Sequence, residues 1–180
     1  MRVVAGSARG RRLGPVPPGA RPVADRAREG LFSSLGSLVE EARVLDLFAG
    51  TGALGIEALS RGASAATFVD SSAAAVAAIR DNLDRTGLGD RASVLRRDAL
   101  GFLEGGGTFD LVLADPPYDT APGTVDALVA AVAGLLEGRD ARFVLTRPLK
   151  GYTPVIPVNL LAARELRYGE TLVLVYQQES

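Results

Sequence analysis

Residues 46–52 read Asp-Leu-Phe-Ala-Gly-Thr-Gly and follow directly on an apolar run that begins at Arg43. A run of this kind, followed by a glycine-rich turn and a second apolar stretch at 53–60, is typical of a parallel strand that passes into a helix. Glycine lets the backbone adopt positive φ and approach a ligand closely. Because open α/β sheets bind ligands at the carboxyl ends of their strands, this turn predicts both the fold and the site.

Strand and helix patterns alternate on both sides of this turn. We expect parallel strands at 43–48, 66–69, 93–96, 109–114 and 142–146. Helices are expected at 26–38, 53–60, 72–85 and 125–136, with a short helical turn at 99–104 and Asp25 as the cap of the first helix. Residues 163–168 and 171–177 surround Gly169-Glu170 and predict a hairpin. The sequence therefore predicts an α/β fold with a seven-stranded, mostly parallel, doubly wound sheet and an antiparallel C-terminal hairpin.

The N-terminal part of the chain has a different character. Residues 2–5 and 12–16 are short strand candidates that can pair across Gly10, and three prolines then disfavour regular structure. Residues 1–28 hold seven arginines and one acid, a net charge of +6 that leaves −7 for the remainder. Since arginine binds phosphate bidentately, this segment indicates a polyanionic partner; a solvated arginine-rich surface is the alternative. We divide the chain into a basic N-terminal hairpin or arm, 1–22, and one α/β domain, 23–180.

Composition limits the possible chemistry. At 180 residues, with 47% hydrophobic and 23% charged residues, the chain is typical of one globular domain. It has no apolar run of membrane-spanning length, and the absence of cysteine suits a cytoplasmic location. Without cysteine or histidine there is no Cys nucleophile, no Ser-His-Asp triad and no zinc site of the usual ligands. We expect neither a metal nor a membrane partner.

Acidic residues occur at the ends of three successive predicted strands: Asp46, Asp70 and Asp98. Residues 50–55 fit the dinucleotide pattern Gly-x-Gly-x-x-Gly, but Asp46 would repel a pyrophosphate and suits the α-ammonium group of S-adenosylmethionine better. Asp70 lies where an acid binds ribose hydroxyls, and Asp98 with Ala99 would lie near the adenine. NAD(H) is the competing cofactor. The predicted cofactor site comprises Asp46, Phe48, Ala49, Gly50, Gly52, Asp70, Ser71, Asp98, Ala99 and Asp115.

A second motif, Asp115-Pro-Pro-Tyr118, ends the run at 109–114. Proline has no backbone N–H and fixes φ, so this loop is extended and leaves the Pro116 carbonyl free. That carbonyl and the Asp115 carboxylate can accept the two hydrogens of an exocyclic amine, while Tyr118 stacks on a flipped-out base, worth about 1–3 kcal/mol. Asp115, Pro116 and Tyr118 are thus the predicted catalytic residues for methyl transfer to a planar amine. A purely structural Pro-Pro loop is the alternative.

These motifs resemble the RsmD-type small-subunit rRNA (guanine-N2)-methyltransferases of bacteria along nearly the whole chain. Residues 2–13 are similar to the opening hairpin of that family, and 21–32 to its Arg-Pro-Thr-Thr-Asp-Arg-Val-Arg-Glu signature. Residues 46–62 are similar over their full length, and Asp115-Pro-Pro-Tyr118 matches as it stands. Two departures are Val23-Ala24 in place of the threonines and Asp70 where many relatives have Glu.

The resemblance implies a Rossmann-like class I methyltransferase fold, S-adenosylmethionine as donor, and methylation at N2 of one guanine in 16S rRNA within a small-subunit particle. It gives the basic residues a role in binding rRNA phosphates, with Arg21 and Arg26 closest to the site. The predicted RNA-binding residues are Arg9, Arg11, Arg12, Arg21, Arg26 and Arg28. We expect a monomer.

Three other functions fit parts of the pattern. A DNA adenine methyltransferase or a protein glutamine methyltransferase would present another planar amine to the same loop. The lack of a DNA-recognition domain argues against the first, and Asp instead of Asn at 115 against the second. A non-catalytic RNA-binding module is the third, and the intact set of acids and glycines argues against it.

Overall fold

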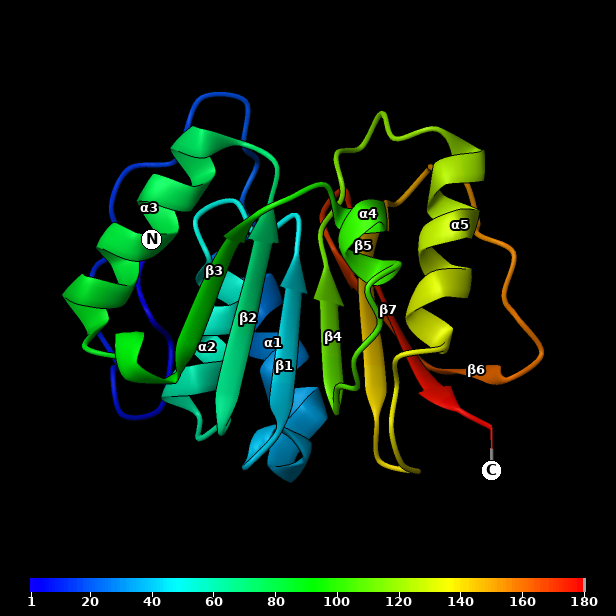
Figure 1. Cartoon of the computed structure of the whole chain (residues 1–180), viewed down its shortest axis with the longest axis horizontal. Helices are drawn as coiled ribbons and strands as arrows, with labels where there is room; N and C mark the ends of the chain where they lie inside the picture. Colours follow the sequence, from blue (N-terminus) through cyan, green and yellow to red (C-terminus); the bar gives the residue numbers. More distant parts are fainter. Residues whose placement is uncertain (180) are drawn as a thin grey trace.

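The strands of the computed structural model, which describes residues 1–179, form a single seven-stranded sheet in the order β3-β2-β1-β4-β5-β7-β6 (Figure 1). They are β1 Arg43–Leu47, β2 Ala65–Asp70, β3 Ala92–Arg96, β4 Leu111–Ala114, β5 Arg142–Pro148, β6 Leu160–Tyr168 and β7 Thr171–Gln178. The first five strands are parallel, and β7 lies antiparallel between β5 and β6. The predicted fold class is therefore confirmed.

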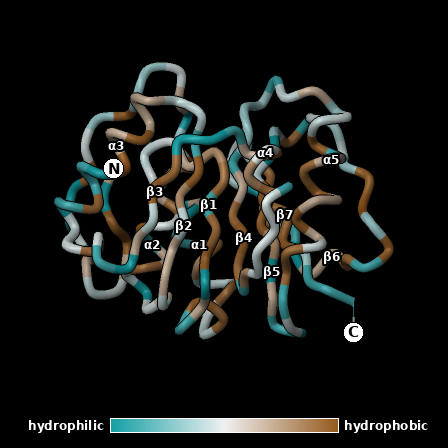
Figure 2. The backbone as a smooth tube through the Cα atoms, in the orientation of Figure 1, coloured by the Kyte–Doolittle hydropathy of each residue, from teal (hydrophilic) through white to brown (hydrophobic). Residues whose placement is uncertain are grey.

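Helices cover both faces of this sheet. They are α1 Asp25–Leu35, α2 Ala53–Ser60, α3 Ala73–Thr86, α4 Ala99–Leu103 and α5 Pro122–Ala133, with the short 3-10 helices η1 Gly36–Val39 and η2 Gly89–Arg91. One apolar core joins α1, α2 and α3 to the sheet, and a second joins α4 and α5 to the opposite face. Figure 2 shows the apolar residues gathered along the strands between these two helical layers.

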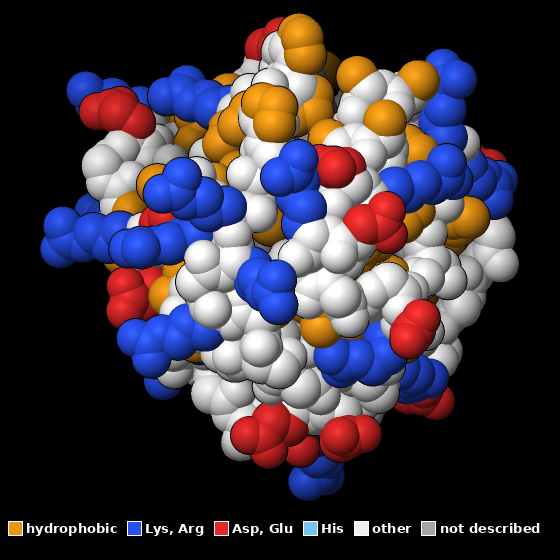
Figure 3. All heavy atoms as spheres, turned by 90° about the vertical axis from the view of Figure 1, so that its left-hand side faces the viewer, with side chains coloured by type: hydrophobic (Ala, Val, Ile, Leu, Met, Phe, Trp, Pro, Cys, Tyr) orange, Lys and Arg blue, Asp and Glu red, His pale blue; other side chains and the backbone are white. Residues whose placement is uncertain are grey.

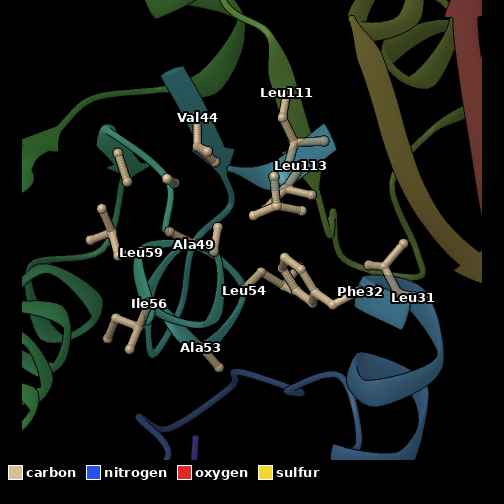
Figure 4. Packing of buried hydrophobic residues seen from close by; sticks show 14 of the residues in the cluster. Leu31, Phe32, Val44, Ala49, Ala53, Leu54, Ile56, Leu59, Leu111 and Leu113 are labelled. Carbon is tan, nitrogen blue, oxygen red and sulfur yellow. The ribbon is translucent and has the colours of Figure 1, made fainter. Parts of the chain in front are cut away.

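Strand β4 shows how one strand serves both cores. Its side chains alternate, as the pleat of a strand requires, so that Leu111 and Leu113 join the first core while Val112 and Ala114 join the second. Figure 4 shows Leu113 on the side of β4 that faces Phe32 of α1, with Leu111 further along the strand beside Val44. A strand buried on both faces reads as a continuous apolar run, which is why the sequence pattern located it.

Several element boundaries differ from the predicted ones. Helix α5 begins at Pro122, three residues earlier than expected, because proline is favoured in the first turn of a helix. Residues 12–16 form no strand, and their pairing with the N-terminus is a single bridge between Arg2 and Arg12. The prediction that Asp25 caps α1 is wrong. The cap position is Ala24, without a side-chain cap, and Asp25 is the first helical residue.

The N-terminal segment is fastened to α2, and to α3 through the Gly14 N–H, which donates to Asn82 Oδ1 at 2.7 Å. Val4 and Ala5 donate their N–H groups to the Glu57 carboxylate at 2.8 and 3.0 Å, and the Ala8 N–H reaches Ser60 Oγ at 2.9 Å. Val3, Ala8 and Leu13 are buried in the core that α1 and α2 share. The first fourteen residues therefore pack into the body of the molecule, although the division at residue 22 stays a prediction.

Arg28 was predicted to bind RNA, and the structure shows that this prediction is wrong. Its side chain is fully buried, where no phosphate can reach it. The guanidinium lies 3.0 Å from Asp25 and 3.8 Å from Glu57, and it donates a hydrogen bond to the Arg2 carbonyl. Glu57 also accepts from Arg61 at 2.8 Å. Arg28 therefore fixes the N-terminal segment instead of serving as a surface cation.

Replacing Glu57 with glutamine should destabilise the protein strongly. The change leaves the buried Arg28 guanidinium without its buried counter-charge, and loss of one partner from such a pair costs about 3–5 kcal/mol. Urea unfolding followed by circular dichroism measures the loss. Asp81→Asn is the control, because it breaks an ion pair with Arg85 whose side chains are 49% and 52% exposed. The free energy of unfolding of that control should fall by no more than about 1 kcal/mol. Equal losses in the two variants would show that the buried pair does not hold this region together.

Candidate active site

A cavity of about 510 Å³ opens at the carboxyl ends of β1, β2 and β4. This volume is in the range of small-molecule sites. Strand β1 pairs with β2 on one side and β4 on the other, so the cavity lies where the strand order reverses, the usual ligand position in such sheets. Residues of both predicted motifs line it: Asp46, Phe48, Ala49, Gly50 and Thr51 from the first, and Asp115, Pro116, Pro117 and Tyr118 from the second. Gly52, which was predicted to contact the cofactor, is not among the described lining residues.

The glycine-rich turn has an unusual backbone. Phe48, Gly50 and Gly52 all have positive φ, at 55°, 57° and 76°. For Phe48, which has a Cβ, this conformation costs about 1–3 kcal/mol and marks a constrained site. Position 55 requires glycine for a different reason: a Cβ there would lie 2.4 Å from the Phe68 ring. This close approach lets the Gly55 N–H donate to Asp46 Oδ2 at 2.9 Å.

Three carboxylates converge on the cavity. Asp46 is fully buried, and burial raises its pKa well above the usual value; the nearby charges of Asp115 and Asp70 raise it further, while the Gly55 hydrogen bond lowers it. All three acids line the cavity wall. Such a wall repels phosphates and attracts cations. The charge pattern therefore argues against a pyrophosphate ligand and for a cationic one.

Asp70 joins the two turns that follow β1 and β2. Its carboxylate accepts hydrogen bonds from the Gly50 N–H and the Ser72 N–H, both at 2.9 Å. Ser71 lines the cavity beside it, and the Ser72 hydroxyl caps α3 by accepting from Ala75. Asp70 thus fixes the glycine-rich turn and retains free lone pairs for a ligand.

Asp98 and Ala99, unlike Asp46 and Asp70, are not among the described residues that line the cavity. The Asp98 carboxylate caps α4 by accepting from the Gly101 N–H at 3.0 Å, and Ala99 is buried in the second core. The adenine contact predicted for these two residues stays a prediction.

The Asp115 carboxylate is held from the neighbouring strand. The buried Thr146 hydroxyl of β5 donates to Asp115 Oδ1. Burial raises the pKa of Asp115 to about 6, while the Thr146 hydrogen bond and the charges of Arg147 and Arg21 act in the opposite direction. No hydrogen bond within residues 1–179 uses the Pro116 carbonyl. One carboxylate oxygen and one carbonyl are therefore available to an amine.

Tyr118 is half-buried at the edge of the same cavity. Its hydroxyl lies 2.8 Å from Thr171 Oγ1 of β7, which fixes the ring. The Arg21 guanidinium lies over the ring, 4.9 Å from its centre. Arg147, buried beneath this loop, has its Nη1 3.4 Å from the Pro117 carbonyl.

Sequence reasoning missed one wall of the cavity. Residues 17–23 line it, whereas the sequence placed only Arg21 of this segment near the site and treated the rest of 17–22 as part of a basic arm. The proline-rich composition of this segment resembles a solvated extension, and its docking depends on contacts far away in sequence. The signal that could have located it is the match of residues 21–32 to a family signature. Thr146 and Arg147 were also missed, because an ordinary strand pattern gives no sign of which side chains reach a neighbouring loop.

The remaining predicted RNA-binding arginines are exposed. Arg9, Arg11, Arg12 and Arg26 are at the surface with Arg21, which lies at the cavity. Figure 3 shows many positive side chains, with acids between them, on the side of the molecule that carries the N-terminal segment and α3. Exposure leaves these residues available to a polyanion.

Within residues 1–179, no cluster of three or more His, Cys, Asp or Glu side chains is arranged to hold a metal ion. Across the same residues, no helix is long and apolar enough to cross a membrane.

Known proteins similar to this chain were found by sequence and by structure. The family model "Conserved hypothetical protein 95" matches residues 1–177. The chain is 36% identical over 188 residues to "Ribosomal RNA small subunit methyltransferase D" of Escherichia coli K12, covering 100% of this chain and 91% of that protein. The solved structure of Escherichia coli yhhF, described provisionally as a methyltransferase, has a TM-score of 0.86 at 34% identity and covers 100% of this chain and 98% of its own. The solved structure of a hypothetical protein of Thermus thermophilus has a TM-score of 0.80 at 34% identity, with 97% of this chain and 98% of its own covered. The chain therefore belongs to the conserved hypothetical protein 95 family, the RsmD methyltransferases.

Proposed function

We propose that this protein transfers a methyl group from S-adenosylmethionine to the exocyclic N2 amine of a guanine in 16S rRNA of the small ribosomal subunit. The observation that carries the proposal is that the glycine-rich turn and the Asp115–Tyr118 loop line one cavity. The small-subunit rRNA named for the Escherichia coli relative supports the choice of substrate, as does the exposed Arg21 at the cavity.

The cavity suits the proposed donor. When bound, S-adenosylmethionine supplies a methyl group on a positively charged sulfur, together with an ammonium group that also carries positive charge. Asp46 would hold the ammonium group, directly or through water, and Asp70 would accept the ribose hydroxyls. The N-terminus of α2, directly after the glycine-rich turn, favours a carboxylate. The ammonium, carboxylate and ribose hydroxyl groups of the donor would thus each have a complementary group in the cavity wall.

The Asp115 loop would hold and aim the amine. With Oδ1 bound by Thr146, the other carboxylate oxygen and the Pro116 carbonyl accept the two N–H groups. This arrangement directs the nitrogen lone pair out of the plane of the base. Alignment of this kind contributes about 7–11 kcal/mol in the best cases. As the N–C bond forms and the S–C bond breaks, Asp115 or solvent accepts the proton that the nitrogen loses.

Small subunits from a strain that lacks the enzyme should acquire one methyl group per 16S rRNA when incubated with the protein and tritiated S-adenosylmethionine. Digestion to nucleosides and mass spectrometry should identify N2-methylguanosine. Asp115→Ala should abolish the labelling, because it removes one amine acceptor, while calorimetry shows donor binding largely retained. Label on adenine or on protein would contradict the substrate, and loss of donor binding would contradict the role of Asp115.

The rate of methyl transfer should depend on the ionisation of Asp115. Only the ionised carboxylate lacks a competing proton, and its pKa is about 6, so the single-turnover rate should fall about tenfold per pH unit below that value. Thr146→Val removes a hydrogen bond that stabilises the charged form, so the acidic limb should move to higher pH. Thr146→Ser keeps the hydroxyl and should keep the limb in place. A limb that is the same in all three proteins would rule out control by Asp115.

Asp46→Asn should weaken donor binding without lowering the stability of the fold. Its pKa is raised in the folded state, so the ionised carboxylate opposes folding at neutral pH, whereas an amide can still accept from Gly55 without a charge. We expect a melting temperature equal to or above that of the native protein. Donor affinity should fall at least tenfold, about 1.4 kcal/mol, in calorimetry. Asp90→Asn, a change at an exposed acid of η2, should alter neither quantity. Unchanged donor affinity in Asp46→Asn would remove Asp46 from the site.

A further inference from the structure

The Tyr118 ring is held in one orientation and covered on one face. Its hydroxyl is bound at Thr171, and the Arg21 guanidinium carbon lies 4.9 Å from the ring centre. Arg21 and Tyr118 both line the cavity, so the covered ring face and the guanidinium belong to the same site. That is the site at which a base would have to approach the Asp115 loop.

The guanidinium occupies the place of a stacked base. Aromatic pairs in proteins, stacked or edge-to-face, have ring centres about 4.5–7 Å apart, and the Arg21 guanidinium carbon lies within that distance of the Tyr118 ring centre. A base cannot enter between two groups already in contact. Stacking of the target guanine on this face of Tyr118 therefore requires Arg21 to leave.

We infer that Arg21 is a displaceable cap on the base subsite: it covers Tyr118 in the RNA-free enzyme and gives way to the target guanine, its guanidinium moving to an rRNA phosphate. This inference rests on the proposed function, because it takes the base subsite from it. A phosphate contact was already expected of Arg21. The inference adds a second position for this side chain, over the Tyr118 ring in the RNA-free enzyme.

The energies favour this exchange only when RNA is present. Stacking of a base on an aromatic ring is in general at least as favourable as a cation held over that ring at an exposed site. Displacement alone would leave the guanidinium without a partner, but a phosphate provides a charge-assisted hydrogen bond. A free nucleoside offers no neighbouring phosphate, so the cap favours a base that arrives within an RNA chain.

The local structure allows Arg21 to move. The residue is exposed and belongs to an irregular segment before α1, so no helical hydrogen bond breaks when it shifts. Within residues 1–179 its side chain makes no hydrogen bond or ion pair: it contacts the Tyr118 ring, and its charge acts on Asp115. Arg26, five residues further on, is also exposed but makes no such contact with a ring among these residues. Arg26 is therefore a matched control for charge.

A tryptophan at position 118 makes the cap measurable. The chain has no tryptophan, so Tyr118→Trp introduces a single indole whose emission reports this site alone. In the RNA-free protein, adding Arg21→Ala should raise the acrylamide quenching constant at least twofold, because the covering group is gone. Adding Arg26→Ala should leave it unchanged. Equal quenching with and without Arg21 would overturn the inference.

Protein-free 16S rRNA tests the exchange in the same three proteins. A base that enters the subsite should shield the indole from acrylamide, and the difference between Arg21 and Arg21→Ala should then disappear. If the indole of Arg21→Ala stays as accessible with RNA as without it, no base takes the place of the cap and the inference fails.

Native Tyr118 provides a second readout that needs no tryptophan. Nitration of Tyr118 by tetranitromethane, quantified by peptide mass spectrometry, should be faster in Arg21→Ala than in the native protein or in Arg26→Ala. Equal nitration rates in the three proteins would again overturn the inference that Arg21 covers Tyr118. Failure of the proposed function is distinguishable, because it appears as absent methyl transfer to small subunits by the native protein, whatever the quenching and nitration show.

Discussion

The position of β1 between β2 and β4 is the constraint on which the site depends. The parallel register pairs Leu47 with Val69 on one side and with Ala114 on the other, so the three strands end at the same level. Asp70 and Asp115 are the residues next to these positions, and Asp46 precedes Leu47. Backbone hydrogen bonds of the sheet thus bring three acids together that are far apart in sequence.

Several local features of this arrangement lower the stability of the folded protein. Like charges approach one another around the cavity, Asp46 is buried, and Phe48 has a left-handed backbone. Two apolar cores, one on each face of the sheet, supply the opposing stability. The N-terminal segment adds to it, because Glu57 and Arg28 fasten residues 2–5 to the helices. Arg28 also donates to the carbonyl of Val23, at the end of the segment 17–23 that lines the cavity.

The features that the sequence predicted correctly are those with local causes. Apolar runs of strand length, glycine-rich turns and a stiff Asp-Pro-Pro-Tyr segment depend on nearest neighbours, and they identified the sheet and both cavity loops. The prediction that Arg28 binds RNA was wrong because its sequence surroundings resemble those of the exposed Arg26. Only tertiary packing distinguishes the buried ion pair of Arg28 from the surface cation at Arg26. Thr146 acts on Asp115 from an adjacent strand, a relation that no spacing along the chain reveals.

The charge distribution connects the inside of the site with its surroundings. Acids line the cavity interior, and exposed arginines of the N-terminal segment and α1 lie outside it. An acidic interior attracts a cationic donor and repels phosphate, while a basic surface attracts polyanionic RNA. If the proposed function holds, these opposite preferences would keep the RNA backbone out of the cavity while an uncharged base enters it. Arg21 lies at the boundary between the two regions, in contact with the aromatic ring on which that base would stack. One side chain at this boundary can therefore respond to both the base and the phosphate, which no residue wholly inside or wholly outside the cavity can do.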